Sequence, residues 1–407
     1  MKVGKLIINV YANDISLPIS DALVLVNGDG YHKHYQTDIS GKIYIDDLPA
    51  PDKEYSMYPQ TEVKPYSTYK LSVTKPGFVP VTINNVEILD GQTSIQNVYM
   101  PYATDQFMKE EIINLPEHNL WGDYPAKIPE DPIKTPEDLR VLPKVIIPEY
   151  VIVHDGIPSN ATATNYYVSF PDYIKNVASG EIYATWPRET IKANVHAICS
   201  FTMNRIFTEW YTSRGYNFTI TSSPAYDQSY APNRTIYQTI SDIVDEIFWY
   251  YIKLPNVVQP FFAQYNDGIK TNNPGWLSQW GSKDLGERGY TALEILKYYY
   301  TNTLTLERAE EIIGLPFSFP GYNLKLDSCG EAVQKMQNEI NKINGNYPGI
   351  PKIIPSDGKF EQNTKNSVEI FQRVFDLPVT GIVDFATWYK ISYIFVAVSK
   401  MIAGVAG

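Results

Sequence analysis

Residues 181–197 decide the fold of the middle of the chain, and they read Glu-Ile-Tyr-Ala-Thr-Trp-Pro-Arg-Glu-Thr-Ile-Lys-Ala-Asn-Val-His-Ala. Pro187 suits a first helical turn, because the N–H group that proline lacks would be unpaired there anyway. Glu189 places a negative charge at the positive end of the helix dipole. Apolar residues then recur every three to five positions, which predicts a helix with a buried face: Ile191, Val195, Ile198, Met203 and Ile206.

Glu181 lies just ahead of this predicted helix, where burial of a helix face does not explain an acidic residue. A carboxyl group held at the mouth of a rigid helix is a candidate general acid and base. The alternative is a surface or capping residue with no chemical role. Glu189, by contrast, is better explained as the charge of a helix N-terminus than as the acid.

Composition limits the classes of function. The chain has 407 residues, enough for two to four domains, and its hydrophobic content of 44% supports ordinary globular cores. Charged residues make up only 19% and aromatic residues 14%, with 32 tyrosines. Such a composition suits contact with sugars, and it suits β-sheet packing equally well. The net charge of -11, with no run of Lys or Arg, argues against nucleic acid as a partner.

Neither the cysteines nor the histidines predict a metal site, and no cofactor is implied. Cys199 and Cys329 fall in different predicted domains, so we expect two free thiols. Among the five histidines only His32 and His34 alternate on one strand face, which is more typical of a solvated face. No stretch has the length of a membrane helix, and no secretory signal follows Met1, so we expect no membrane partner and synthesis without Sec export.

Turn residues and apolar spacing predict a multidomain protein with four segments. Residues 1–103 alternate as in an all-β sandwich, and residues 104–148 are a proline-rich linker that a protease would cut most easily. Residues 149–322 are predicted to be α+β and residues 323–407 to be three helices around one core. The expected strands are 6–10, 22–26, 42–45, 69–73 and 79–83. The expected helices, besides the one after Pro187, are 239–252, 291–300, 331–343, 363–375 and one from 385.

The last segment resembles the peptidoglycan-binding domain of the three-helix type. The matching pattern is Gly330, Val333, Gln337, Asn341, 357–360, Thr364, Val368, 371–372, 377–378, Gly381, 383–384 and 387–388. Most of these are turn glycines, core residues and helix caps. The resemblance implies recognition of peptidoglycan, without saying which side chains touch it.

Residues 149–322 resemble the lytic transglycosylase domain of stage II sporulation protein D. Residues 181–197 fall in register with that family's catalytic motif, and the stretches 227–230, 264–268, 277–281 and 289–300 follow in the family's order. The resemblance implies that Glu181 is the catalytic acid. It also implies a substrate-binding set: Trp186, Asp227, Gln228, Tyr230, Tyr265, Ser278, Gln279 and Trp280. Where the family has a histidine before its last signature, this chain has Asn273, which cannot donate a proton in its place.

Residues 1–103 resemble the carboxypeptidase-regulatory-like sandwich, a module that is usually accessory. The whole arrangement resembles clostridial spore-cortex-lytic enzymes of the SleC type. That resemblance implies a zymogen that acts on cortex glycan in the spore during germination. It also implies activation by a germination protease, with the cut expected in the linker.

A lytic transglycosylase needs one carboxyl group, whereas ordinary glycosidases use two. The expected products end in 1,6-anhydro-muramic acid, and the pKa of Glu181 should be raised by burial near apolar groups. Two other hypotheses stand beside this one. One is a peptidoglycan-binding protein without catalysis, which Asn273 favours, and the other is a wall enzyme of a phage tail or bacteriocin.

Overall fold

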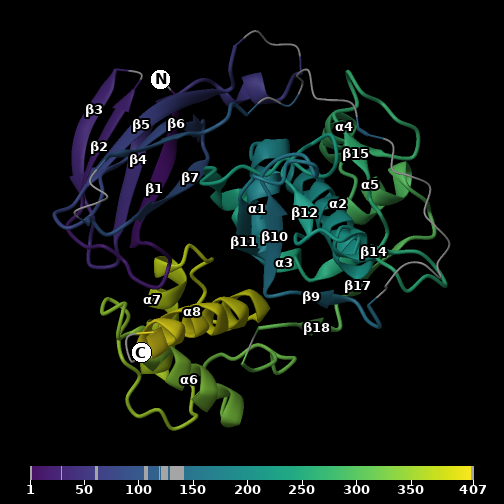
Figure 1. Cartoon of the computed structure of the whole chain (residues 1–407). Coiled ribbons are helices and arrows are strands. Elements are labelled where there is room, and N and C mark those ends of the chain that lie inside the picture. The colour runs from purple at the N-terminus through teal and green to yellow at the C-terminus, as the bar shows by residue number, and fades with distance from the viewer. Residues whose placement is uncertain are drawn as a thin grey trace. The chain divides into compact units, whose positions relative to one another are not determined.

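The computed structural model describes residues 2–28, 30–59, 63–104, 109–118, 120, 127–128, 142–314 and 316–404. The chain divides into two compact units (Figure 1). The terminal unit comprises Met1–Asp52, Tyr66–Leu115 and Gly314–Gly407, and the central unit comprises Lys53–Pro65 and Pro116–Ile313. Residues near both ends of the chain therefore share one unit.

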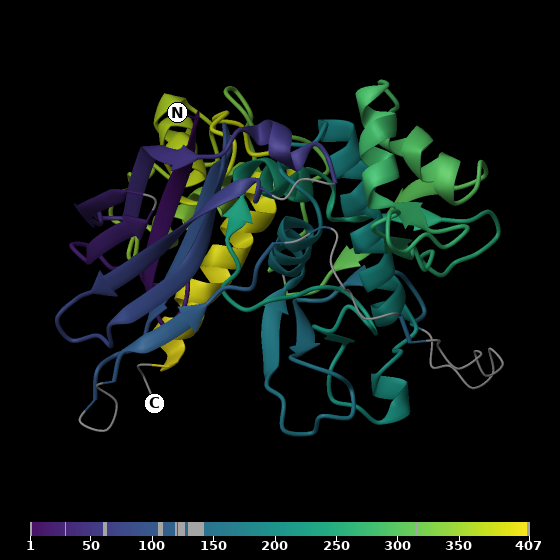
Figure 2. The same ribbon diagram turned by 90° about the horizontal axis from the view of Figure 1, so that it is seen from above.

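The N-terminal part of the terminal unit is rich in sheet, as the alternating sequence predicts. In one sheet β1 (Lys2–Ala12) pairs antiparallel with β4 (Lys42–Ala50) and parallel with β7 (Thr93–Met100). The other sheet has the order β3-β2-β5-β6-β8 (Figures 1 and 2). Its strands are β2 (Leu23–Gly28), β3 (Tyr31–Gln36), β5 (Tyr66–Thr74), β6 (Val81–Leu89) and β8 (Glu111–Asn114). Inward-facing residues of both sheets form one apolar core, since alternate residues of a strand face the same side.

The predicted linker 104–148 is partly built into the fold. Strand β8 lies within it and pairs in parallel with β6, and a second short strand, β9 (Ile146–Ile147), pairs with β18 (Glu311–Ile312). The proline-rich sequence did not predict either strand, because each strand depends on pairing with a partner that is distant in the sequence. The activating cut was expected within 104–148, and much of this range, namely residues 105–108, 119, 121–126 and 129–141, lies outside the described residues.

The C-terminal part of the terminal unit is helical. Its helices are α6 (Glu331–Ile343), α7 (Gln362–Val374) and α8 (Phe385–Gly404), and their apolar faces form one core. A buried ion pair joins these helices to the N-terminal sheet within the unit. Lys42 of β4 donates to Asp376 at 2.7 Å, and Asn9 of β1 donates to the other carboxylate oxygen at 3.0 Å.

The central unit is built around α2 (Arg188–Phe207), the helix that the sequence predicts after Pro187. All of α2 is buried except Arg188, Glu189 and Lys192, so it is a core helix that is enclosed on nearly all sides. The helices α3 (Gln238–Ile247), α4 (Gln279–Glu287) and α5 (Ala292–Tyr299) pack against it. The three-stranded sheet β11-β10-β12 completes the unit, with β10 (Tyr150–His154), β11 (Asn165–Ser169) and β12 (Ile220–Thr221).

Two features of the central unit go beyond or against the prediction. Glu181 precedes α2 as expected, but it is also the last residue of an unpredicted helix, α1 (Phe170–Glu181), which begins after the N-cap Ser169. The helix predicted over 239–252 ends at Ile247, and its last residues form β14 (Tyr250–Lys253), which pairs with β17 (Thr305–Arg308). The aromatic and β-branched residues of that end favour a strand once a partner strand is present.

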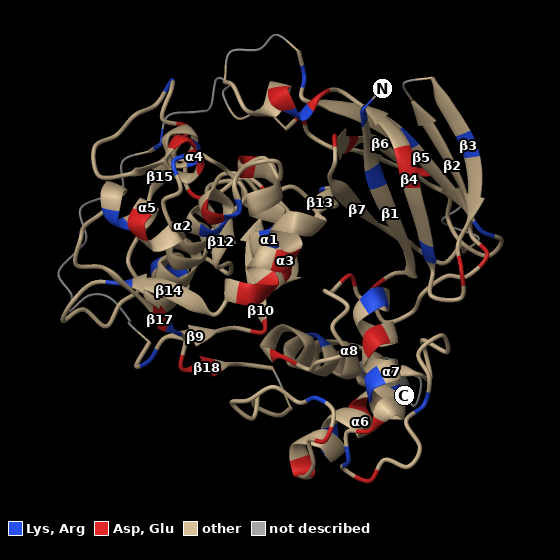
Figure 3. Cartoon of the chain, turned by 180° about the vertical axis from the view of Figure 1, so that it is seen from behind, with Lys and Arg blue, Asp and Glu red and all other residues tan. Residues whose placement is uncertain are grey.

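The remaining short strands place residues of the site. They are β13 (Ile236–Tyr237), β15 (Tyr265–Asn266) and β16 (Leu277–Ser278), and β15 pairs in parallel with β16. Positions of basic and acidic residues are scattered over the elements of each unit (Figure 3). Among the described residues, no helix is both long enough and apolar enough to span a membrane.

Candidate active site

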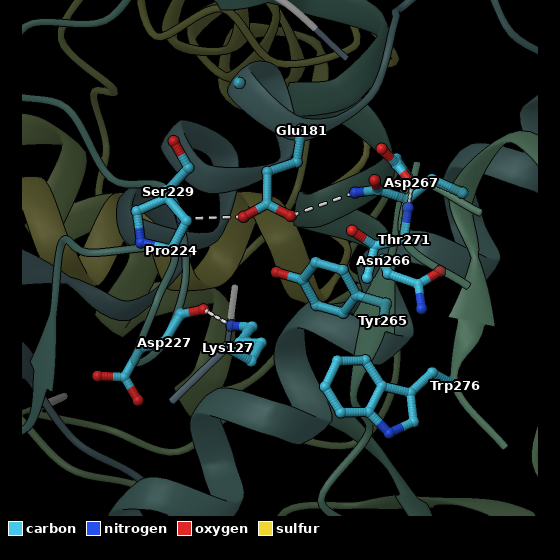
Figure 4. A pocket seen from close by; sticks show the side chains of 12 residues that line it. Lys127, Glu181, Pro224, Asp227, Ser229, Tyr265, Asn266, Asp267, Thr271 and Trp276 are labelled. Atoms are coloured by element: carbon cyan, nitrogen blue, oxygen red, sulfur yellow. Dashed lines mark hydrogen bonds between the residues drawn. The ribbon is translucent and has the colours of Figure 1, made fainter. Parts of the chain in front are cut away.

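Glu181 closes the C-terminal end of α1, and its carboxyl group faces a pocket of the central unit (Figure 4). One carboxylate oxygen accepts a hydrogen bond from the Ser229 backbone N–H at 2.9 Å, and the other accepts one from Gln279 Nε2 at 3.2 Å. Two donors from distant segments therefore fix the orientation of the carboxyl group. A residue that only caps a helix or lies on the surface would not require such a fixed orientation.

Burial raises the pKa of the Glu181 carboxyl above its ordinary value. The Ser229 N–H group, the Lys127 ammonium and the Tyr265 hydroxyl each act in the opposite direction, because they favour the ionised form, yet the pKa stays raised. A raised pKa increases the protonated fraction near neutral pH. A general acid requires such a protonated fraction.

The pocket around Glu181 has a volume of about 660 Å³, including the part open to solvent. This is within the range of small-molecule sites in proteins, about 300–1,000 Å³. It is lined by Lys127, Gly180, Glu181, Pro224, Asp227, Ser229, Tyr265, Asn266, Asp267, Thr271, Trp276 and Gln279. Of the predicted site residues, the structure thus brings Glu181, Asp227, Tyr265 and Gln279 together.

Several buried polar atoms at this pocket have no hydrogen-bond partner in the described part of the protein. They are the Tyr265 hydroxyl, both amide atoms of Asn266 and Oδ2 of Asp267. Burial, and after it the charge of the neighbouring Glu181, raises the pKa of the Tyr265 phenol, although no well-formed hydrogen bond joins the two side chains. Buried polar groups in proteins are nearly always hydrogen-bonded, so unpaired atoms on a pocket wall indicate a place for ligand or water.

Asp227 lines the pocket, but its carboxylate is used internally. Oδ1 accepts from Arg205 Nε at 2.8 Å, and Oδ2 accepts from the Tyr211 hydroxyl at 2.6 Å and from the hydroxyl and N–H groups of Thr221 at 2.7 and 2.9 Å. Only its backbone carbonyl faces the pocket, where it accepts from Lys127 Nζ. Asp227 therefore holds the pocket wall in place.

Gln228 and Tyr230 stand behind the pocket. Gln228 is fully buried, accepts from the Tyr173 and Thr202 hydroxyls at 3.0 and 2.8 Å and donates to the Ile198 carbonyl. Tyr230 stacks on Tyr173 with ring centroids 5.8 Å apart. These contacts position the turn that carries the Ser229 N–H group.

Trp186 and Trp280 are buried and lie outside the pocket lining. Their rings meet edge to face at 4.9 Å, and the Trp186 indole donates to the Ser56 carbonyl at 2.9 Å. The predicted substrate-binding residue Ser278 caps α4, accepting from the Gly281 N–H group at 3.0 Å. In the structure these three side chains make contacts within the protein and do not line the pocket.

Glu189 accepts a hydrogen bond from the Ala292 N–H group at 2.8 Å, so its carboxylate caps the N-terminus of α5 and also places a negative charge at the N-terminus of α2.

Both cysteines are free thiols, Cys199 buried and Cys329 exposed. Within the described ranges, no cluster of three or more His, Cys, Asp or Glu side chains is arranged to hold a metal ion.

Further pocket residues were not predicted from the sequence: Lys127, Ser229, Asn266, Asp267, Thr271 and Trp276. Asn266 and Asp267 lie inside the quoted stretch 264–268, so their place could have been read from it. Lys127 comes from the predicted linker, and nothing in the local sequence indicates that it reaches the pocket of Glu181, 54 residues further along the chain.

In the C-terminal helices, two buried glutamines of the quoted pattern are structural. Gln337 accepts from the Gly358 N–H group at 2.9 Å and donates to the Lys359 carbonyl at 2.8 Å. Gln372 accepts from the N–H groups of Thr380 and Gly381, both at 2.9 Å. Each glutamine satisfies the polar backbone of one turn, and this explains why the pattern contains both.

Residues 329–391 match the family model described as "Putative peptidoglycan binding domain". The chain therefore carries a peptidoglycan-binding domain at its C-terminus. This supports association with the cell wall and peptidoglycan as a partner. No curated protein matches the chain.

Solved structures match short parts of the chain. One is a mutant cohesin–X-dockerin complex from Acetivibrio cellulolyticus, with 19% identity, 24% of this chain and 51% of that chain covered, and a TM-score of 0.16. Another is a mutant catechol 1,2-dioxygenase from Acinetobacter radioresistens, with 14% identity, 28% and 58% covered, and a TM-score of 0.19. The chain spans only about half the length of these two proteins.

Proposed function

We propose that this protein is a lytic transglycosylase that cleaves the glycan strands of peptidoglycan, with Glu181 as its single acid and base. The observation that carries the proposal is a carboxyl group at the wall of a pocket, oriented by two donors and with a pKa raised by burial. A peptidoglycan-binding domain in the same chain supplies the substrate class.

The proposed reaction has two proton transfers. Protonated Glu181 first gives its proton to the glycosidic oxygen between MurNAc and GlcNAc, and the bond from that oxygen to C1 of MurNAc breaks. The ionised carboxylate then takes the proton of the C6 hydroxyl, whose oxygen bonds to C1 of the same sugar. The products are a free GlcNAc hydroxyl end and a 1,6-anhydro-MurNAc end, and Glu181 is protonated again. General acid and base assistance of this kind contributes about 10²- to 10⁴-fold.

The surroundings of Glu181 suit both halves of the reaction. The Ser229 N–H group and Gln279 stabilise the ionised form that follows the first step, because both donate to the carboxylate. The unpaired polar atoms of Asn266 and Asp267 are placed to bind sugar hydroxyl and acetamido groups. A second carboxylate is not needed, because the attacking hydroxyl belongs to the substrate.

We further propose, from the resemblance to spore-cortex-lytic enzymes of the SleC type, that the substrate is spore cortex and that the protein acts in the spore during germination. The same resemblance suggests synthesis as a zymogen, with a cut between residues 104 and 148 by a germination protease. The length of the proline-rich stretch supports a site that a protease can reach.

The test uses purified cortex peptidoglycan, the full chain with and without limited proteolysis, and the variant Glu181→Gln. We expect soluble fragments from the wild type, a loss of at least 10²-fold in Glu181→Gln, and no change in Glu307→Gln, an exposed glutamate on β17. Thermal unfolding of each variant reports whether the fold is kept.

A second function is tested by the same experiment. Only the peptidoglycan-binding domain is matched by a family, and Asn273 stands where the transglycosylase family has a histidine. A protein that binds cortex and releases no fragments, before or after proteolysis, would be a wall-binding protein with a degenerate catalytic domain.

A further inference from the structure

The segment Lys53–Pro65 lies between β4 and β5 in the sequence, yet it belongs to the central unit. Ser56 in this segment is fully buried there. Its carbonyl accepts a hydrogen bond from the Trp186 indole at 2.9 Å, and its hydroxyl is hydrogen-bonded to the Thr185 hydroxyl at 2.6 Å. These contacts, which we call the Ser56 anchor, attach the N-terminal part of the chain to the central unit.

Another attachment lies in the terminal unit, between the first sheet and the end of α7. Lys42 Nζ donates to Asp376 Oδ1 at 2.7 Å and to Asn9 Oδ1 at 2.6 Å, and Asn9 Nδ2 donates to Asp376 Oδ2 at 3.0 Å. The Lys42 side chain is 1% exposed, so water competes little for its ammonium group. Losing one partner of such a buried pair is far more costly than losing a surface ion pair. We call this cluster the Asp376 anchor.

Further contacts beside the Asp376 anchor join the same two parts of the terminal unit. Asn346 donates to the Ser16 carbonyl at 2.9 Å, and the buried Tyr347 donates its hydroxyl to the Ile15 carbonyl. The Ile15 side chain packs against the apolar core of the helices. The junction thus combines apolar packing with buried hydrogen bonds, as the centre of a stable interface does.

The place of these contacts in the sequence matters for the proposed cut. In each anchor, one side lies before residue 104 and the other side lies after residue 148. A cut anywhere between these positions therefore breaks the chain and none of the contacts. A cut ahead of β8 would leave its pairing with β6 as an additional contact between the fragments.

We propose that the cut chain remains a complex of two fragments, in which the N-terminal fragment stays bound through the Ser56 and Asp376 anchors. The proposal rests on the cut proposed for the linker and is independent of the reaction proposed for Glu181. Two attachments on one fragment reinforce each other, because binding at one holds the other at a high effective concentration. Cutting therefore frees the linker and leaves the N-terminal sheets in place.

The Ser56 anchor also gives the retained fragment a connection to the candidate active site. Trp186, which donates to Ser56, packs its ring against Trp280 of α4 at 4.9 Å. The residue before Trp280 is Gln279, which donates to the Glu181 carboxylate. Loss of the fragment would leave the Trp186 indole without the Ser56 carbonyl, so retention preserves a support of the segment that orients Glu181.

The experiment uses the full chain with the recognition sequence of a site-specific protease inserted between residues 123 and 124. Complete cutting is verified under denaturing conditions, and the cut protein is then separated by size under native conditions. A tag at the N-terminus holds the complex on a surface, so that the dissociation rate of the C-terminal fragment can be measured. Thermal unfolding of each uncut variant reports whether its fold is kept.

We expect the two wild-type fragments to elute together at micromolar concentration. Asp376→Asn should speed dissociation at least about tenfold, because a charge-assisted hydrogen bond to the buried Lys42 is lost, whereas asparagine tolerates the positive φ of this position. Ser56→Ala should speed dissociation by a smaller factor, and the double variant should dissociate faster than either. The matched control is Asp357→Asn, an exposed carboxylate of the same domain, which should keep the wild-type rate.

Recovery of the wild-type fragments apart after cutting, in soluble or aggregated form, would overturn the proposal. So would a double variant that dissociates at the wild-type rate, because the named anchors would then not hold the fragments together. Neither readout requires catalysis. A stable complex that forms no anhydro ends would contradict the proposed function alone, and separated fragments with such activity would contradict the retained complex alone.

Discussion

Glu339 gives a prediction about the stability of the peptidoglycan-binding domain. It lies on α6, is 3% exposed, and faces Ser392 of α8, whose hydroxyl donates to Oε2 at 3.3 Å. Oε1 is buried and has no hydrogen-bond partner in the described part of the chain. Burial raises the pKa of this carboxyl from 4.5 to about 7.

The size and sign of the effect of Glu339 on the free energy of unfolding follow from the linkage between proton binding and folding. The difference between 4.5 and about 7 corresponds to about 3 kcal/mol of destabilisation when Glu339 is fully ionised. Because the folded state binds the proton more tightly than the unfolded state, the contribution of Glu339 to the stability of the domain is greatest below pH 4.5. Stability is then lost as the pH rises from 4.5 through about 7. Glu339→Gln keeps the shape and removes the titration, so it should stabilise the domain at pH 8 and change little at pH 4.5.

The assay is hydrogen–deuterium exchange of the full chain, followed in peptides from α6 and α8 and corrected for the pH dependence of intrinsic exchange. We expect up to about 3 kcal/mol more protection in Glu339→Gln than in the wild type at pH 8. The matched control is Glu331→Gln on the same helix, an exposed residue paired with Lys335, which should give no such gain. Equal protection of wild type and Glu339→Gln at pH 8 would refute the reasoning.

Three further predictions concern the central unit. Asp227→Ala should lower the free energy of unfolding by about 3–5 kcal/mol, because it removes the carboxylate that pairs with the buried Arg205 guanidinium; a loss below 1 kcal/mol in chemical denaturation would contradict this. Gly268→Ala should destabilise by about 2 kcal/mol or more, since φ is +78° and an added Cβ would lie 1.7 Å from Ser278 Oγ; an unchanged melting temperature would argue against it. Tyr265→Phe should move the alkaline limit of activity to higher pH, because Tyr265 lowers the pKa of Glu181, whose protonated form is the proposed acid; a pH–rate profile with a lower or unmoved limit would show otherwise.

Local signals in the sequence predicted several of the helices, although α1 and α4 were not among them. Pro187 and the apolar spacing after it predicted α2, and the turn glycine Gly330 with the following periodicity predicted α6 with the bounds that the structure has. Capping and periodicity act within a few residues, so they can be read without knowing the rest of the fold. The same reasoning could not show that α2 is enclosed on nearly all sides.

The candidate site was predictable only in part. Glu181 stood out because no helix face explained it, and it does line a pocket. The roles of Asp227 and Lys127 depend on partners far away in the sequence, Arg205 for the first and the Asp227 carbonyl for the second. Tertiary packing decides which polar atoms of the site are already hydrogen-bonded within the protein. A single sequence does not carry that information.

The central claim is that Glu181 lets a muramyl sugar attack its own C1 without water. The most direct test is digestion of purified cortex by the full chain in water enriched in ¹⁸O, followed by mass spectrometry of the new ends. We expect 1,6-anhydro ends that carry no ¹⁸O and that are absent from the Glu181→Gln digest. Reducing ends labelled with ¹⁸O, or anhydro ends still formed at wild-type rate by Glu181→Gln, would contradict the assignment of Glu181.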